Sequence, residues 1–89
     1  MIRMFVRHTV TDFATWKQAY DDYEETRQRM GAKGHDAFRS VDDPNDVTAW
    51  HDFESMEAAR AFVDSGDLKV AMEKAGVTGP PTIWFATRV

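Results

Sequence analysis

The order of the predicted secondary-structure elements is the strongest constraint on how this chain folds. Apolar and polar residues alternate over residues 2–10 and 47–54, as in strands with one buried face, and two more strands are predicted at 35–41 and 82–88. Residues 13–30 and 56–75 instead place apolar residues three or four positions apart, as helices do. The order β-α-β-β-α-β predicts one α+β, ferredoxin-like domain over residues 1–89, with a four-stranded antiparallel sheet.

Short polar residues and glycines indicate where the two helices begin and end. Thr11 or Asp12 can cap the first helix, and the glycines at 31 and 34 can end it in a left-handed conformation. Ser55 can cap the second helix, which is interrupted at residues 64–67 and then restarts. The first helix is expected to face the sheet with one stripe of large residues: Phe13, Trp16, Tyr20, Tyr23, Arg27 and Met30.

The segment 42–46, with the sequence Asp-Asp-Pro-Asn-Asp, predicts the turn of a hairpin between the second and third strands. These residue types favour turns, and a proline blocks the continuation of a strand. The side chains of such a turn satisfy one another and the local backbone, so we expect no ligand at this tip. The last strand is expected to begin only after Pro80 and Pro81.

Composition and charge exclude several classes of protein. The chain has no cysteine, which excludes a disulfide framework, a thiolate metal site and a cysteine nucleophile. The net charge of −4 argues against nucleic acid as a partner. No segment approaches the ~20 apolar residues of a membrane span, so we expect an unprocessed cytoplasmic protein with no membrane partner.

The predicted sheet has large apolar side chains on the face away from the helices. Alternation places four aromatic residues there, interleaved with Arg3, Arg7 and Asp52: Phe5, Phe38, Trp50 and Trp84. A patch of this kind is rarely left exposed on a monomer, which predicts burial in a homodimer. RNA recognition motifs also use aromatic side chains on an open sheet, but this chain lacks their Lys/Arg-Gly-aromatic motif and has the wrong charge.

Four short segments of the sequence resemble those of a known superfamily. They are Val-Arg-His-Thr-Val at 6–10, Asp-Asp-Pro-Asn-Asp-Val at 42–47, Glu-Ala-Ala-Arg-Ala-Phe at 57–62 and Ala-Gly-Val-Thr-Gly-Pro-Pro at 75–81. Together they resemble small bacterial proteins of the dimeric α+β barrel superfamily, which includes antibiotic biosynthesis monooxygenase-like domains. The resemblance covers nearly the whole chain and implies that two ferredoxin-like subunits pack their sheets into a barrel. Because that superfamily hosts oxygenases, isomerases, cyclases and haem-degrading enzymes, it identifies a scaffold and no single reaction.

Two histidines are the candidate catalytic residues. If Val6 and Phe53 point at the helices, strand periodicity places His8 and His51 on the same face. An imidazole can transfer protons near neutral pH, and a cleft lined by aromatic residues suits a flat apolar substrate, for which Trp16, Tyr20 and Tyr23 are the candidate binding residues. The structural alternative is that each histidine only makes hydrogen bonds within a partly solvated core.

Two further features have competing interpretations. Arg27 is on the inward stripe, where the favoured interpretation is that it snorkels at the sheet edge and the alternative is that it binds an anionic group of the substrate. His8 and His51 could also share a metal ion, or one of them could ligate a haem. Adjacent pairs such as His35-Asp36 point to opposite faces of a strand and cannot chelate one ion.

The preferred functional hypothesis is a small-molecule-binding homodimer that acts as a cofactor-independent oxygenase-like enzyme on an aromatic, enolic or polyketide-like compound. His8 or His51 would remove or shuttle a proton to give a carbanion that reacts with dioxygen. The alternatives are an isomerase or cyclase that uses the same proton transfer, and a non-catalytic binding or assembly protein. We expect no flavin, haem or metal, because the chain contains no glycine-rich nucleotide motif and no His-Glu-x-x-His.

Overall fold

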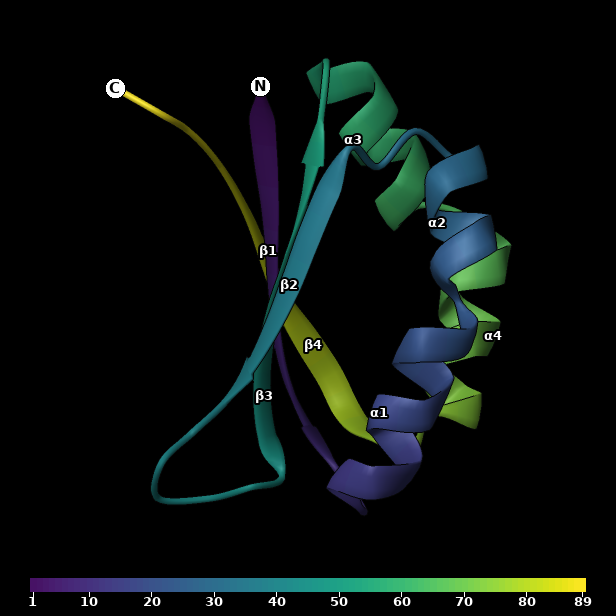
Figure 1. Cartoon of the computed structure of the whole chain (residues 1–89), viewed down its shortest axis with the longest axis vertical. Coiled ribbons are helices and arrows are strands. Elements are labelled where there is room, and N and C mark those ends of the chain that lie inside the picture. The colour runs from purple at the N-terminus through teal and green to yellow at the C-terminus, as the bar shows by residue number, and fades with distance from the viewer.

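The computed structural model describes residues 1–89 and contains one sheet covered by helices on a single face (Figure 1). The strands are β1 (Ile2–Val10), β2 (Gly34–Arg39), β3 (Asp46–Phe53) and β4 (Val77–Thr87), in the antiparallel order β2-β3-β1-β4. The helices are α1 (Phe13–Asp22), α2 (Glu24–Arg29), α3 (Met56–Val63) and α4 (Gly66–Lys74). The topology is therefore ferredoxin-like, with β1 and β3 at the centre of the sheet, and this prediction is confirmed.

The core lies between the helices and the sheet. Alternate residues of the two central strands are buried there, including Met4 and Val6 of β1 and Ala49 and Phe53 of β3. Phe62 of α3 packs against Phe53, with 5.2 Å between the ring centroids. None of the four helices combines the length and apolar character that crossing a lipid bilayer requires.

The first helical segment is broken at Tyr23 and is not the continuous helix that its periodicity predicts. Asp12 caps α1 through a hydrogen bond from the Thr15 backbone N–H, as expected for one of the two candidate caps. At the break the Tyr23 N–H turns back to the Tyr20 carbonyl, 3.3 Å away. The same carbonyl accepts a hydrogen bond from Nη2 of Arg27, so a side chain on α2 stabilises the interruption.

Strand β4 begins at Val77, five residues earlier than the sequence predicts, and includes Pro80 and Pro81. Prolines are tolerated there because β4 is an edge strand with β1 as its only neighbour. The pairing register of β1 with β4 shifts between Arg7 and Thr9, and Gly79 on the opposite side has a φ of +71°. A bulge at this point therefore accommodates the prolines within a strand.

The hairpin tip makes hydrogen bonds outside the turn that the sequence does not predict. Asp43 closes the turn locally by accepting a hydrogen bond from the Asn45 N–H, as expected. Asn45, however, accepts two hydrogen bonds from outside the turn, one at its carbonyl from the Val10 N–H and one at Oδ1 from the Phe13 N–H. The tip therefore helps to hold the connection between β1 and α1, which is where the first helix begins.

Candidate functional site

A small cavity of about 60 Å³ lies between the helices and the helix-facing side of the sheet. Most of its wall is apolar, with side chains from β1, β3, β4 and all of the helices. The polar and aromatic residues of the wall include every residue that the sequence nominates for a site: His8, Trp16, Tyr20, Tyr23, Arg27 and His51. The predicted face is therefore correct for both histidines, while their chemical roles stay predictions.

His8 lies on β1 opposite Val47 and is only 7% exposed. Neither of its ring nitrogens has a hydrogen-bond partner in the protein. The Trp16 ring meets it edge-on, with 5.8 Å between centroids. Burial lowers the pKa of His8 below its ordinary value of 6.5, so the ring is neutral at pH 7 and has one free lone pair and one free N–H.

His51 lies on β3 opposite Met4 and is only 6% exposed, but its environment differs from that of His8. Its Nε2 accepts a hydrogen bond from Nε of Arg27 at 3.0 Å, while Nδ1 is buried without a partner. Burial, and next the positive charge of Arg27, lower the pKa of His51 to about 3. His51 is therefore a poor proton acceptor, because its basic lone pair is already occupied.

Arg27 does not snorkel, and that prediction is wrong. It is 1% exposed and lies among the cavity residues, where its guanidinium faces the Tyr20 ring at 4.3 Å from the centroid. The three donor atoms Nε, Nη1 and Nη2 contact His51, the Glu24 carboxylate and the Tyr20 carbonyl, respectively. An arginine can be buried here because fixed acceptors surround its donors, and those acceptors are parts of the protein rather than an anionic ligand.

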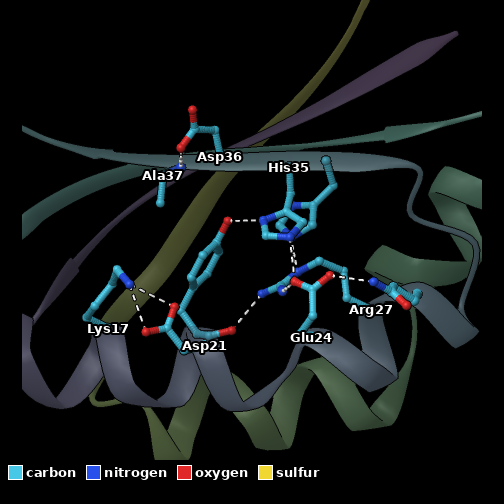
Figure 2. Close-up of polar contacts among 10 residues, drawn as sticks. Lys17, Asp21, Glu24, Arg27, His35, Asp36 and Ala37 are labelled. Carbon is cyan, nitrogen blue, oxygen red and sulfur yellow. Dashed lines mark hydrogen bonds and ion pairs between the residues drawn. The ribbon is translucent and has the colours of Figure 1, made fainter.

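His35 belongs to the same polar network and was not nominated from the sequence. Figure 2 shows it on β2, above Glu24 and Arg27 of α2, between the sheet and the helix. Its Nδ1 is hydrogen-bonded to the Tyr20 hydroxyl, and its Nε2 is hydrogen-bonded to Glu24. His35 is also the direct cross-strand partner of His51, with 5.9 Å between the ring centroids. Period-two alternation through β2 and its register with β3 are the signals that could have found it.

The charged groups in this network affect one another's ionisation. Hydrogen bonds from Gln28 and His35 hold the pKa of the Glu24 carboxyl below its ordinary value. Burial raises the pKa of the Tyr20 hydroxyl to about 12, with the nearby carboxylates of Asp36 and Glu24 acting in the same direction. Glu24 is therefore the anion that balances Arg27, and Tyr20 is a neutral hydrogen-bonding group at pH 7.

Aromatic side chains form one wall of the cavity along α1. Trp16 and Tyr20 stack with 4.9 Å between centroids, and Trp16 also stacks on Phe13. Tyr23, at the break between α1 and α2, packs edge-on against Phe62. This wall provides flat apolar surfaces of the kind that bind aromatic rings.

The register of the sheet disfavours a metal ion shared by the two histidines. His8 pairs with Val47 and His51 pairs with Met4, so the two rings start from positions four residues apart along adjacent strands. At about 3.3 Å per residue the two Cα atoms are roughly 13 Å apart, so both side chains would have to extend fully toward each other to bind one ion. No group of three or more His, Cys, Asp or Glu side chains in the structure has a geometry suited to a metal.

The cavity is smaller than an aromatic ligand requires. An engineered cavity of about 150 Å³ holds benzene, and typical ligand pockets are about 300–1,000 Å³. Binding of such a ligand therefore requires the wall to move outward. Helix α4 is the element best able to move, because none of its residues is buried. A groove on the outer surface between α1, α2 and α4 shares three lining residues with the cavity, namely Ala19, Tyr23 and Ala71. These residues mark the route from the groove into the cavity.

Comparison with known proteins gives the fold a context. No protein-family model matches the chain, and no curated protein matches its sequence. Among solved structures, a candidate antibiotic biosynthesis monooxygenase from Bordetella bronchiseptica is 19% identical, with a TM-score of 0.86 over 99% of this chain and 96% of that one. The chain shares its fold with this structure and with others that carry the same description.

Two further structures with this fold cover nearly the whole chain. A candidate antibiotic biosynthesis monooxygenase from Nitrosomonas europaea is 17% identical, with a TM-score of 0.78 over 100% of this chain and 99% of that one. SnoaB from Streptomyces nogalater, a cofactor-independent oxygenase, is 16% identical, with a TM-score of 0.76 over 99% of this chain and 94% of that one. At these identities the similarity establishes a shared fold and leaves the chemistry to be argued from this chain's own residues.

Proposed function

We propose that this protein binds an aromatic or enolic small molecule in the cavity between helices and sheet and oxygenates it without a cofactor. The observation that supports this most strongly is His8, a neutral imidazole with two unpartnered ring nitrogens in an apolar cavity with an aromatic wall. A buried polar group without a partner in the protein is costly, and a catalytic role is one explanation for its presence. SnoaB, which has the same fold, is a cofactor-independent oxygenase.

The chemistry begins with proton removal by His8. The free lone pair of its ring takes a proton from an acidic C–H or enolic O–H of the substrate, and the electron pair stays on the substrate as a carbanion or enolate. This electron-rich species reduces dioxygen and forms a C–O bond to it, giving a peroxide that takes up a proton. Loss of water then converts an activated methylene group into a carbonyl, with dioxygen supplying one oxygen atom to the product and one to water.

The same proton transfer without dioxygen would give an isomerase or a cyclase, so oxygen uptake is the deciding measurement. Purified protein is mixed with tricyclic aromatic ketones that have an acidic methylene group, and dioxygen consumption is followed together with the mass of the product. We expect one dioxygen consumed per carbonyl formed, with no loss of rate after treatment with a chelator. Product formation that proceeds equally in anaerobic buffer would replace the oxygenase hypothesis by an isomerase or cyclase.

The small volume of the cavity favours a second candidate, a protein that only assembles and binds no small molecule in this cavity. In that case the histidines would be buried behind Trp16 and Tyr20 and would not meet a substrate. Helix α4 would then stay closed in the presence of every compound tested. Amide hydrogen exchange in α4 distinguishes the two, because a ligand that enters the cavity must change the protection of that helix.

We also propose that a second copy of the chain covers the open face of the sheet. Phe5 and Trp84 stack there with 5.2 Å between centroids, and Trp84 and Phe38 are 42% and 54% exposed. The guanidinium of Arg3 lies over the Trp50 ring at 3.7 Å. It also forms a two-point ion pair with Asp52, so the charges between the aromatic residues are already satisfied within one chain. Such a surface is apolar and internally neutralised, which suits a self-complementary dimer interface.

Replacing Trp84 with glutamate is expected to convert the dimer into a folded monomer. The side chain is partly exposed in a single chain, so its loss affects the interface more than the protomer. Burying a large aromatic side chain contributes about 1.5–3 kcal/mol, and a twofold axis would count it twice. Light scattering measures the mass, with V70E as the matched control because Val70 is similarly exposed on α4. A wild-type protein that is monomeric at micromolar concentration contradicts the proposal.

A further inference from the structure

We infer that His51 is a fixed hydrogen-bond donor whose Nδ1–H binds an oxygen atom of the ligand, and that Arg27 sets this role by fixing the tautomer of the ring. The inference rests on the proposed function and deepens it, because it assigns a different role to each of the two histidines. His8 moves the proton, and His51 binds the oxygen on which negative charge develops.

The tautomer of His51 follows from the chemistry of its neighbour. A guanidinium has only N–H donors and stays protonated at every pH that a protein experiences. Nε of Arg27 therefore donates to Nε2 of His51, which must have an unprotonated lone pair facing it. A neutral imidazole has its single proton on the other nitrogen, so the proton lies on Nδ1.

The Arg27 side chain is itself held in place on its other sides. Nη1 donates to Glu24 at 2.9 Å and Nη2 donates to the Tyr20 carbonyl at 2.9 Å, while the Tyr20 ring packs against the guanidinium plane. With the three contacts fixed, Arg27 cannot rotate away and release Nε2 of His51. Arg27 is thus a positioning residue that acts through His51.

The Nδ1–H of His51 is left as a buried donor without an acceptor in the protein. A donor in this state costs free energy unless a group in the adjacent cavity accepts its proton. In the closed protein this nitrogen has almost no surface that a cavity water could touch, so the donor is satisfied only when the wall opens to a ligand. A ligand that enters must then offer an acceptor, which selects a carbonyl, enolate or phenolate oxygen at this end of the cavity.

The positions of the two histidines then define how a ligand lies. His8 and His51 are four residues apart along the central strands, with the aromatic wall of α1 alongside. A flat compound would place its oxygen near His51 and its acidic hydrogen toward His8. Proton removal by His8 increases the negative charge on that oxygen, and the fixed donor at His51 stabilises it without reorganisation.

The direct test is the protonation state of the His51 ring, measured through its side-chain nitrogens by NMR on ¹⁵N-labelled protein at pH 7. We expect a proton on Nδ1 and none on Nε2, which is the less common tautomer of histidine in water. Finding the proton on Nε2, or on both nitrogens, overturns the inference in the wild-type protein without any variant. The measurement needs no substrate, so it succeeds or fails separately from the oxygen-uptake assay.

Two variants of Arg27 test the cause of the tautomer. R27M removes the donor while keeping much of the side-chain volume, so the proton of His51 should move to Nε2 in most molecules. R27K keeps one charged donor and should retain the proton on Nδ1. If R27M folds and still has the proton on Nδ1, Arg27 is not the positioning residue. If R27M does not fold, the wild-type measurement decides, because a proton on Nε2 facing the guanidinium would rule out Arg27 as the residue that fixes the tautomer.

Ligand selectivity tests the oxygen site. The probes are 1-indanone and indane, which have the same ring skeleton and differ by one carbonyl oxygen. A hydrogen bond to a buried donor should make the ketone bind about tenfold more tightly in an NMR titration. H51F should abolish this preference, whereas H8F should retain it. A preference that is absent in wild type, or that H8F abolishes and H51F does not, overturns the assignment of the oxygen site to His51.

Discussion

Replacing His8 with phenylalanine is expected to lower the turnover rate by about a hundredfold to ten-thousandfold, the usual cost of losing a positioned general base. The same substitution should leave the fold intact and increase its stability. His8 makes no hydrogen bond that the change would break, and its two unpartnered ring nitrogens cost free energy on burial. A phenyl ring has a similar shape and fits beside Trp16. Loss of activity together with a higher unfolding temperature would identify a residue retained for chemistry.

The pH dependence of the rate provides an independent check on His8. The neutral ring is the active form, so activity should be lost as the pH falls through the His8 pKa and retained above it. Because burial lowers this pKa below 6.5, more than half of the maximal kcat/KM should remain at pH 6.5. An acidic limb with an apparent pKa above 6.5 would assign the base to another group. Unchanged turnover in H8F would remove the main support for the enzyme hypothesis.

The sequence was sufficient to predict the sheet and the face to which each histidine belongs, because both depend on strict periodicities. Alternation along β1 and β3 places His8 and His51 with Val6 and Phe53 on the buried side, and the structure agrees. Caps such as Asp12 and Ser55 were predictable because their hydrogen bonds are local. These predictions need no information about which distant residues meet.

The polar network could not be predicted, because it depends on contacts between elements. Arg27 was expected on the inward stripe with its head group snorkelling at the sheet edge, but acceptors from α1, α2 and β3 surround its donors. The break at Tyr23 involves the same arginine, because Nη2 of Arg27 donates a hydrogen bond to the Tyr20 carbonyl at which the helix is interrupted. His35 was overlooked because its role comes from its pairing with His51 across two strands. In each case a deciding partner belongs to another element of the fold.

Acid is expected to destabilise the protein well before its carboxylates are protonated, because His51 must gain a proton on unfolding. Its pKa is about 3 in the folded protein and about 6.5 in an unfolded chain. Between these pH values the unfolded chain binds a proton that the folded protein does not, so lowering the pH favours unfolding. The full stability is present above pH 6.5. It should fall by about 2 kcal/mol between pH 6.5 and pH 4.5, a large part of the stability of a small domain.

Four carboxyls with lowered pKa values act in the same direction, mainly below about pH 5: Asp12, Glu24, Asp46 and Asp52. Urea unfolding at pH 6.5, 5.5 and 4.5 therefore needs a histidine variant to separate the contribution of the histidines from that of the carboxyls. H51Q is the matched variant, because a glutamine side chain can still accept from Nε of Arg27 but does not titrate. H51Q should reduce the dependence of the unfolding free energy on pH more than any other single change. H8F should reduce it less, and it has an effect because the pKa of His8 is also lowered. A wild-type stability that is flat across this range would mean that the His51 pKa is ordinary, and Arg27 would then not control its protonation.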